Sequence, residues 1–590
     1  MAEKIVSPGV FTRENDLSFL PAGIGEIGAA IVGPTVKGPV LVPTLVSTYA
    51  EYVDKFGDTF QSGSDYYQFL TSHTAERYLQ FGGALTVVRI AGDGFSVATA
   101  SVNTSSAATT AGSKSFTLHT LSHGATLNSV ASDGTVTEGA NNLLPEGTKD
   151  NLRYEITGKN NETGTFNVNI RRGNDTNNNK VIVEQFNGVN LDPNTSNYIG
   201  KAIGDSYFQI QGTESDPYIQ SVGDYENKST LVRVEVHKQT VNYLDENGSV
   251  RVPAASASLP ANGSGSLGGA FGGGADGSTV SGARKYYENI TSLNSQGYDL
   301  NDLANANGGS AYAKGLQLLA NQDFYDINMI LVPGANQNQH AAVVNKAISV
   351  AETRGDAIAI VDPVPHNTTT LSTVTGEAND YNTSYAAMYW PWIKIADNQL
   401  GLNRWVPPSV VMPGVMSFND SIAAEWFAPA GLNRGGINAI RAERNLTHTD
   451  RDTLYEGKIN PIATFPGVGV CAWGQKTLQK KASALDRINV RRLLINLKKF
   501  IASTSRFLVF ENNTVATRNR FLSSVVPYME EVQANQGLFA FKVVMDTTNN
   551  TPDVIDRNIL KGDIFLQPAK AAEFIVIDFN VLPTGATFGD

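Results

Sequence analysis

The sequence predicts an α/β (α+β) protein of several domains. A mixed-sheet core is interrupted by a β-rich insertion, and a C-terminal α/β domain follows, with extended arms at both chain ends. Three observations lead to this class. Strand and helix signals alternate in residues 22–95 and return in 283–400, whereas 96–282 carry short strand signals among Ser, Thr, Asn and Gly. The 590 residues also exceed what one hydrophobic core normally supports.

The first part of the core reads as a strand, two helices and a strand. In order, the expected elements are a strand from Ile27 to Val32, a helix capped by Ser47 or Thr48 and ending at Gly57, a helix from Asp65 to Gln80, and a strand from Leu85 to Ile90. The second part contains DINMILVPG, HAAVVNKAISVAETRG and DAIAIVDPVP, a strand, a helix and a buried strand. This βαβ unit implies parallel strands, so residues 22–95 and 283–400 are expected to form one core domain.

Residues 96–282 are predicted to be an inserted β-rich domain. Runs such as TFNVNIRR and TLVRVEVHK alternate apolar and polar residues between turn signals. The Gly/Ser-rich stretch between Ala261 and Gly282 is expected to be a linker or a surface loop.

Residues 401–572 are predicted to be a C-terminal domain. The expected order is a strand-like stretch over 459–474, a long helix from Ala482 to Ser503, the strand RFLVFEN, a helix from Val515 to Gln533, the strand FAFKVVMD, a helical turn at Pro552 and a final pair of strands. Pro527 should kink or split its helix, since proline donates no hydrogen bond.

Both chain ends are expected to be extended arms, over residues 1–21 and 573–590. Pro8-Gly9 breaks any helix near the start, and EFIVIDFNVL near the end is rich in β-branched and aromatic residues. The residues expected to make the inter-subunit strands are Ile5, Val6, Val10, Phe11, Phe574, Ile575, Val576, Ile577 and Phe579. The alternative is that both strands fold onto their own domain.

Composition excludes several classes of protein. A net charge of −11 argues against direct binding of nucleic acid, and the single cysteine, Cys471, excludes an internal disulfide. The N-terminus has no apolar signal core, and no run approaches the about 18 apolar residues of a membrane span. A soluble protein is expected, kept in a reducing compartment or released without secretion.

No catalytic or cofactor motif is recognisable. The sequence contains no phosphate-binding loop, no H-E-x-x-H motif and no G-x-S-x-G elbow. His119 and His123 are four residues apart in a predicted strand and turn, where their side chains do not converge on a metal. Cys471 lies in an apolar strand and is expected to be buried. We therefore expect no enzyme, no metal site and no cofactor.

One stretch of the chain is strongly basic. Between Cys471 and Arg520 there are eleven Lys or Arg and two acids, so this window carries +9 and the rest of the chain −20. A docking face for an acidic partner is the favoured interpretation; a solvated helix surface and a nucleic-acid contact are the alternatives. The candidate residues are Lys480, Lys481, Arg487, Arg491, Arg492, Lys498 and Lys499.

Several segments resemble, in collinear order, the tail sheath proteins of contractile phages and related contractile injection machines. They are SPGVFTREND, GAAIVGPTVKGPVLVPTLVSTYAEYVDKFG, VEQFNGVNLDPNTSNYIGKAIGD, INPIATFPGVGVCAWGQKTL, DRINVRRLLINLKKFIASTSRFLVFENN and KGDIFLQPAKAAEFIVIDFNV. In the third segment, Asp192-Pro193-Asn194 is expected to end a strand and open a helix. The resemblance is weak over most of residues 96–280.

The resemblance implies a non-enzymatic polymer. Sheath subunits stack as hexameric rings around an inner tail tube, together with baseplate and tail terminator proteins, and the arms add strands to neighbouring subunits. For such a sheath, the change in composition predicts that the insertion lies at high radius, and some of the basic candidates are expected to face an acidic tube. The sheath is expected to be assembled in the host cytoplasm and to reside in the virion. The alternatives are the sheath of a bacteriocin or secretion-type system and, from another class, a β-rich adhesin.

Overall fold

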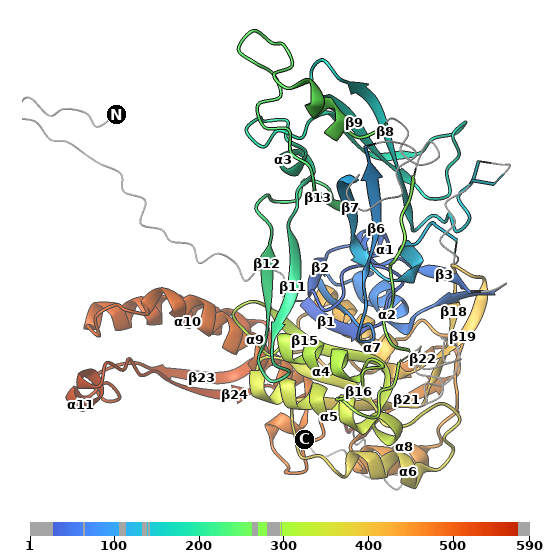
Figure 1. Ribbon diagram of the computed structural model, residues 1–590. Helices are drawn as coiled ribbons and strands as arrows, with labels where there is room; N and C mark the ends of the chain where they lie inside the picture. Colours follow the sequence, from blue (N-terminus) through green and yellow to red (C-terminus); the bar gives the residue numbers. More distant parts are fainter. Residues whose placement is uncertain are drawn as a thin grey trace, which may run out of the picture. The chain divides into compact units, whose positions relative to one another are not determined.

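The computed structural model describes residues 28–62, 65–104, 114–131, 138–139, 142–261, 269–279, 296 and 298–575. They form two compact units, 28–495 with 570–575, and 496–569. Helices and strands occur in both units, which confirms the predicted mixed α/β class (Figure 1). Seven of the predicted arm residues lie outside the described part of the chain: Ile5, Val6, Val10, Phe11, Val576, Ile577 and Phe579.

The larger unit is built on one eight-stranded sheet. Its strands, from edge to edge, are β2 (Thr44–Val46), β5 (Leu85–Arg89), β1 (Gly28–Gly33), β15 (Ile327–Asn336), β16 (Ile358–Asp362), β17 (Ala386–Trp390), β21 (Ile459–Phe465) and β22 (Gly469–Ala472). Neighbours from β5 to β21 are parallel, and the two edge strands are antiparallel. Strands β1, β5, β15, β16 and β17 are buried at every position, so both faces of the sheet are covered.

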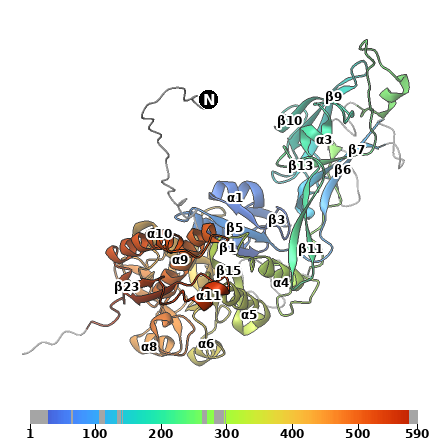
Figure 2. The ribbon, with the colours of Figure 1, turned by 90° about the vertical axis from the view of Figure 1, so that its left-hand side faces the viewer.

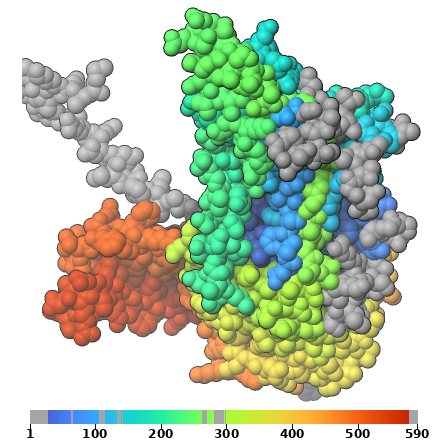
Figure 3. Space-filling view, in the orientation of Figure 1, coloured from blue at the N-terminus to red at the C-terminus, as the bar shows by residue number. Residues whose placement is uncertain are grey.

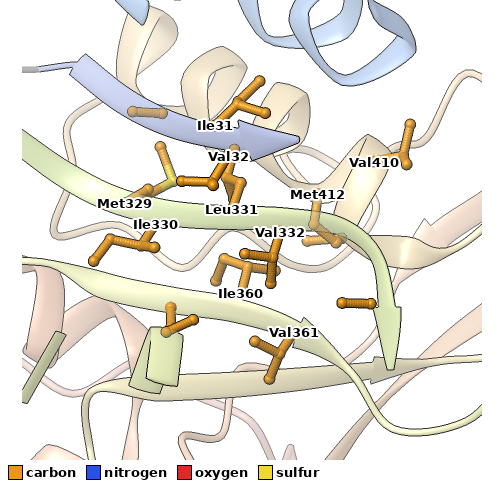
Figure 4. Close-up of a cluster of buried hydrophobic side chains, with 14 of the residues drawn as sticks. Ile31, Val32, Met329, Ile330, Leu331, Val332, Ile360, Val361, Val410 and Met412 are labelled. Carbon is orange, nitrogen blue, oxygen red and sulfur yellow. The ribbon is translucent and has the colours of Figure 1, made fainter. Parts of the chain in front are cut away.

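Two pairs of helices pack against this sheet. Helices α2 (Leu70–Leu79) and α7 (Pro408–Ile422) contact each other, as do α4 (Gly309–Leu318) and α5 (Gln337–Arg354). Helix α5 connects β15 to β16, which confirms the predicted βαβ unit. Figure 4 shows Ile31, Met329, Leu331 and Met412 converging from β1, β15 and α7 into the central cluster.

Local signals were right for most core elements but not for residues 65–69. Helix α1 (Tyr49–Phe56) is capped by Thr48, whose Oγ1 accepts from the backbone N–H of Glu51 at 3.2 Å. The helix predicted from Asp65 begins only at Leu70, because Asp65–Gln68 form strand β4 and pair with β3 (Thr59–Ser62). The Phe60 and Tyr67 rings contact across this hairpin, with centroids 5.8 Å apart.

The structure divides the chain at a different place from the predicted boundary at residue 400. Strand β21 pairs with β17 inside the central sheet, and the larger unit continues to Ile495. Without β21, the backbone edge of β17 would have no partner. Between β16 and β21 the chain of this unit also forms α6 (Leu371–Ala378), β18 (Ile393–Asp397), β19 (Leu402–Val406), β20 (Arg441–Ala442) and α8 (His448–Glu456).

Within the larger unit, the β-rich insertion has its own hydrophobic core. One antiparallel sheet contains β13 (Val232–Val236), β7 (Lys114–His123) and β6 (Val97–Asn103); the other contains β10 (Ile182–Val189), β9 (Thr165–Arg172), β8 (Leu152–Asn160) and β14 (Gly269–Ala270). Helix α3 (Ile199–Ile203) and the hairpin of β11 (Tyr207–Gly212) and β12 (Pro217–Val222) complete it. Ile210 of this hairpin packs against the central core, and the surface of the hairpin reaches back over it (Figure 3).

The insertion is joined to the core by a defined set of contacts. The buried Arg89 guanidinium donates from Nη1 to the carbonyls of Gly38 and His123, and its Nη2 lies 3.1 Å from Asp276 Oδ1. The N–H of Gly92 donates to the Asp276 carbonyl at 3.0 Å. The entering and leaving strands therefore lie side by side, as an interrupted domain requires.

The smaller unit packs a helix on a two-stranded sheet. Helix α9 (Ile488–Ser505) crosses the division at Ile495, and α10 (Val515–Ala534) packs on β23 (Leu538–Val544), which pairs with β24 (Asp563–Pro568). The turn of helix α11 (Pro552–Asp556) lies between these two strands in the sequence, and Figure 2 shows the elements from a second side.

One prediction for the smaller unit was wrong, and the split that was one of two outcomes expected at Pro527 does not occur. The expected strand over residues 506–512 is a 3-10 turn, Arg506–Leu508, followed by Phe510 with φ of +70°, a value outside the β region. Helix α10 is not split at Pro527. Phe521, Val525, Met529 and Val532 are buried along one face at helical spacing, and this packing outweighs one lost backbone hydrogen bond.

Candidate assembly surfaces

The first residue of the predicted C-terminal arm, Glu573, is fastened to its own unit. Its carboxylate accepts from Arg487 Nε at 2.7 Å and Nη2 at 2.9 Å, from Gln475 Nε2 at 3.0 Å and from the Tyr455 hydroxyl at 2.9 Å. Burial by itself would raise the pKa of Glu573, but these hydrogen bonds and the Arg487 charge outweigh it and hold the pKa below the ordinary value of 4.5. We call these four residues the Glu573 anchor.

Beyond this anchor the chain exposes apolar side chains. Phe574 and Ile575 are 79% and 81% exposed and lie outside any regular strand. Of the described strands of the subunit, none pairs with them. Two adjacent apolar residues so fully exposed at a fixed point mark a place where another chain could cover them.

The β23–β24 pair offers the complementary feature, a sheet with two open edges. No third strand joins it among the described residues. Phe539 and Phe565 are 69% and 61% exposed on these strands. An isolated two-stranded sheet is marginally stable in water, and its unpaired backbone edges are templates for added strands.

The basic residues predicted from the sequence do not form one exposed face. Arg491, Arg492 and Lys499 are buried, Arg487 belongs to the Glu573 anchor, and Lys480, Lys481 and Lys498 are exposed. Arg492 donates from Nη1 to Asp420 Oδ1 at 2.9 Å, and the Arg491 guanidinium lies 4.1 Å from the centroid of the Tyr385 ring. Arg491, Arg492 and Lys499 are therefore withdrawn as exposed docking residues, and the tube contact of the exposed lysines stays a prediction. Asp420 lies 72 residues upstream, so a count of charges in one window did not reveal it.

Candidates for chemistry are engaged in structural contacts. Cys471 is buried, which raises the pKa of its thiol to about 11 despite the nearby Arg451. His119 Nε2 lies 2.9 Å from Glu235 Oε2, and His123 Nδ1 accepts from the backbone N–H of Val40 at 3.2 Å. Within the part of the chain that the structure describes, no cluster of His, Cys, Asp and Glu could hold a metal, and no helix is long and apolar enough to cross a membrane.

Family models cover the sheet's second half and the region after it. Residues 306–478 match the phage tail sheath protein central domain, and residues 480–581 match the phage tail sheath C-terminal domain. In these two regions the chain is similar to phage tail sheath proteins. The boundary between the two matches falls just before α9, close to the division of the structure and not at residue 400.

Curated tail sheath proteins are similar to the chain in sequence, and a solved sheath protein structure is similar to it in fold. The chain is 33% identical over 319 residues to the tail sheath protein of Vibrio phage KVP40, covering 50% of this chain and 48% of that protein. It is 32% identical over 291 residues to the tail sheath protein of Enterobacteria phage T4, covering 46% and 44%. The match therefore spans about half the length of these relatives. A sheath tail protein structure from Listeria innocua shares the fold, with a TM-score of 0.52 at 12% identity, over 92% of this chain and 96% of that one.

Proposed function

We propose that the chain is the structural, non-enzymatic subunit of a contractile tail sheath. It polymerises as stacked six-fold rings around an inner tail tube, and contraction drives the tube through the host envelope. The main support for the proposal is that the same chain matches two sheath domains and has surfaces suited to strand addition. These surfaces are the exposed apolar residues that follow Glu573 and the open edges of the β23–β24 sheet.

The arms would link neighbouring subunits by strand addition. Residues 574–590 could span roughly 55 Å when extended. Such a strand would complete the β23–β24 sheet of a neighbour through backbone hydrogen bonds, with Phe539 and Phe565 available as side-chain contacts. The Glu573 anchor would then carry tension from the arm into the larger unit, which suits a sleeve whose subunits move as rigid bodies.

The remaining exposed lysines are proposed to contact an acidic tube. Lys480 and Lys498 keep this assignment, since both are exposed. Lys481 is exposed too but lines a pocket with Ser384 and Tyr385, and Arg491 and Arg492 are used inside the subunit. Charged contacts can align the sheath with the tube without burying a large apolar area. They can therefore bind the tube before contraction and release it during contraction. Baseplate and tail terminator proteins are the other expected partners.

The insertion is proposed to lie away from the polymer contacts, at high radius. Support comes from its separate core and from the adjacency of its two ends at Gly92 and Asp276. A variant in which a short Gly/Ser linker replaces residues 97–272 keeps the Arg89–Asp276 contact and should still stack into rings. Folded protein that fails to assemble would place the insertion in the polymer contact.

The proposed location is the virion, with assembly in the host cytoplasm. A bacteriocin or secretion-type injection system uses the same kind of sheath and remains the second candidate. The curated relatives favour the phage, because both are phage proteins.

The deciding experiment compares assembly of the full chain with a variant ending at Glu573. The truncated protein should remain folded by circular dichroism, because the Glu573 anchor is kept, but should sediment as small species and show no sleeves by electron microscopy. A matched control replaces residues 574–590 with a Gly/Ser segment of equal length, and it should fail in the same way. Sleeves of normal length from both variants would overturn strand addition by this arm.

A further inference from the structure

The larger unit contains a pocket that is lined by polar residues. The hydrogen bonds and ion pairs between described residues of the subunit give this pocket no structural role. Its volume is about 360 Å³. Three segments supply the lining, namely helix α5, the stretch before β17 and the loop after Leu478. The residues are Glu352, Asn382, Thr383, Ser384, Tyr385, Gln479 and Lys481.

A buried cation lies directly behind the pocket wall. The side chain of Arg491 donates from Nη2 to the Ser384 hydroxyl and stacks on the Tyr385 ring, and both of these residues line the pocket. Arg491 is only 3% exposed, and its Nε has no hydrogen-bond partner. Across the described chain, no carboxylate comes within ion-pair distance of it. The adjacent Arg492, in contrast, is neutralised by Asp420.

The charge in and behind the pocket is therefore unbalanced. Lys481 is exposed at the rim, and of the described carboxylates none forms an ion pair with it. Glu352 is the one acid in the lining, so two cations face one anion. A buried guanidinium without a counter-ion is costly, and burial lowers the pKa of Arg491 although Tyr385 opposes this. An added carboxylate would relieve that cost.

We propose that this pocket receives a carboxylate side chain from a second copy of the chain. The carboxylate would meet the Lys481 ammonium and the Ser384 and Thr383 hydroxyls, with the Arg491 charge behind them. The choice of partner rests on the proposed function, since a sheath brings many copies into repeated heterologous contact. It also rests on charge, because the chain outside residues 471–520 carries −20 and offers many acids to such a pocket.

Zero-length cross-linking tests the occupant directly. A carbodiimide joins a lysine amine to a carboxylate that it touches, with loss of water. Polymer assembled from equal parts of ¹⁴N and ¹⁵N protein should yield peptides in which Lys481 of one copy is linked to Asp or Glu of another. Cross-links from Lys481 only to Glu352 of the same copy, or to a tube protein in intact tails, would overturn the proposal.

Charge reversal measures the contribution of the pocket. Lys481→Glu should raise the protein concentration needed for polymerisation roughly five-fold, whereas the matched Lys114→Glu, at an exposed position of the insertion outside the pocket, should leave it unchanged. Arg491→Met should act in the same direction as Lys481→Glu, with folding checked by its melting temperature. Equal behaviour of the Lys481 and Lys114 variants would count against the pocket.

These tests separate the pocket from the sheath itself. Sleeves that form without the inter-copy cross-link overturn the pocket and leave the sheath standing. The cross-link in small oligomers without sleeves supports the pocket and overturns the sheath polymer.

Discussion

The central sheet of the larger unit and the β23–β24 pair of the smaller unit differ in how much of their strand edges and faces is covered. The central strands of the first sheet are buried at every position. The antiparallel strands β2 and β22 form the two edges of this sheet, and helices cover its faces. The β23–β24 pair exposes two phenylalanines and, among the described residues, both backbone edges. The first region forms within one chain, and under the proposed strand addition the second would be completed by other chains.

The difference separates stability from assembly. Substitutions in the central sheet should change the free energy of unfolding and affect assembly only through the loss of folded protein. Substitutions in the β23–β24 pair should leave the free energy of unfolding nearly unchanged and alter polymerisation. The predictions below test this division, from the largest expected effect on folding to the smallest.

Leu331→Ala should produce the largest loss of stability. Leu331 is fully buried at the centre of β15 (Figure 4), and removing its side chain should cost about 2–5 kcal/mol of unfolding free energy through lost burial and a cavity. Urea denaturation followed by circular dichroism measures this. A loss below that of a typical surface substitution would mean that the sheet is not the stabilising core.

Arg492→Leu should be the next most costly substitution. It leaves Asp420 without its partner, and since that carboxylate is about a quarter exposed, we expect a loss of about 2–3 kcal/mol. The matched Arg491→Leu removes a cation that has no carboxylate, so it should cost clearly less. Thermal denaturation of both variants makes the comparison, and equal losses would contradict the assignment of Asp420 as the counter-ion of Arg492 alone.

Asp362→Asn should change how stability depends on pH. Burial raises the pKa of Asp362 to about 7, even though the backbone N–H and hydroxyl of Ser409 favour its charged form. Between the ordinary value of 3.8 and pH 7 the folded state holds a proton that the unfolded state has lost, so stability falls as the pH rises through this range.

The asparagine amide of this variant carries no charge, so the variant should be more stable than the parent at pH 8 by on the order of 1 kcal/mol and similar to it at pH 4. Denaturation at both pH values provides the measurement. A parent protein with the same stability at pH 4 and pH 8, and no gain in the variant, would show that Asp362 is not buried in this way.

Phe565→Ala should have the smallest effect on folding and a clear effect on assembly. Its ring is 61% exposed, so the free energy of unfolding should change by no more than about 0.5 kcal/mol. Sedimentation should nevertheless show weaker polymerisation, because an added strand loses an aromatic contact. Normal polymerisation, together with a large loss of stability, would reverse the comparison on which these predictions rest.

Elements with local signals could be predicted from the sequence alone. A hydroxyl residue at 47 or 48 is expected to cap α1, and Thr48 does so, while α5 between two apolar runs specifies a parallel βαβ unit. The change in composition at residue 96 marked the insertion, which folds around its own core. The collinear segments also predicted a resemblance to tail sheath proteins, and family models match residues 306–478 and 480–581.

Contacts between residues far apart in the sequence could not be predicted in this way, because they depend on the three-dimensional fold. Strand β21 joins the core sheet by pairing with β17, whereas the residues of RFLVFEN form a 3-10 turn followed by Phe510 at positive φ. Helical spacing placed Arg491 and Lys498 on one side of α9, yet one is buried and the other exposed. Asp420, Ser384 and Glu573 lie far from that helix in the sequence. Charge pairing depends on distance in space, and periodicity along one helix contains no information about that distance.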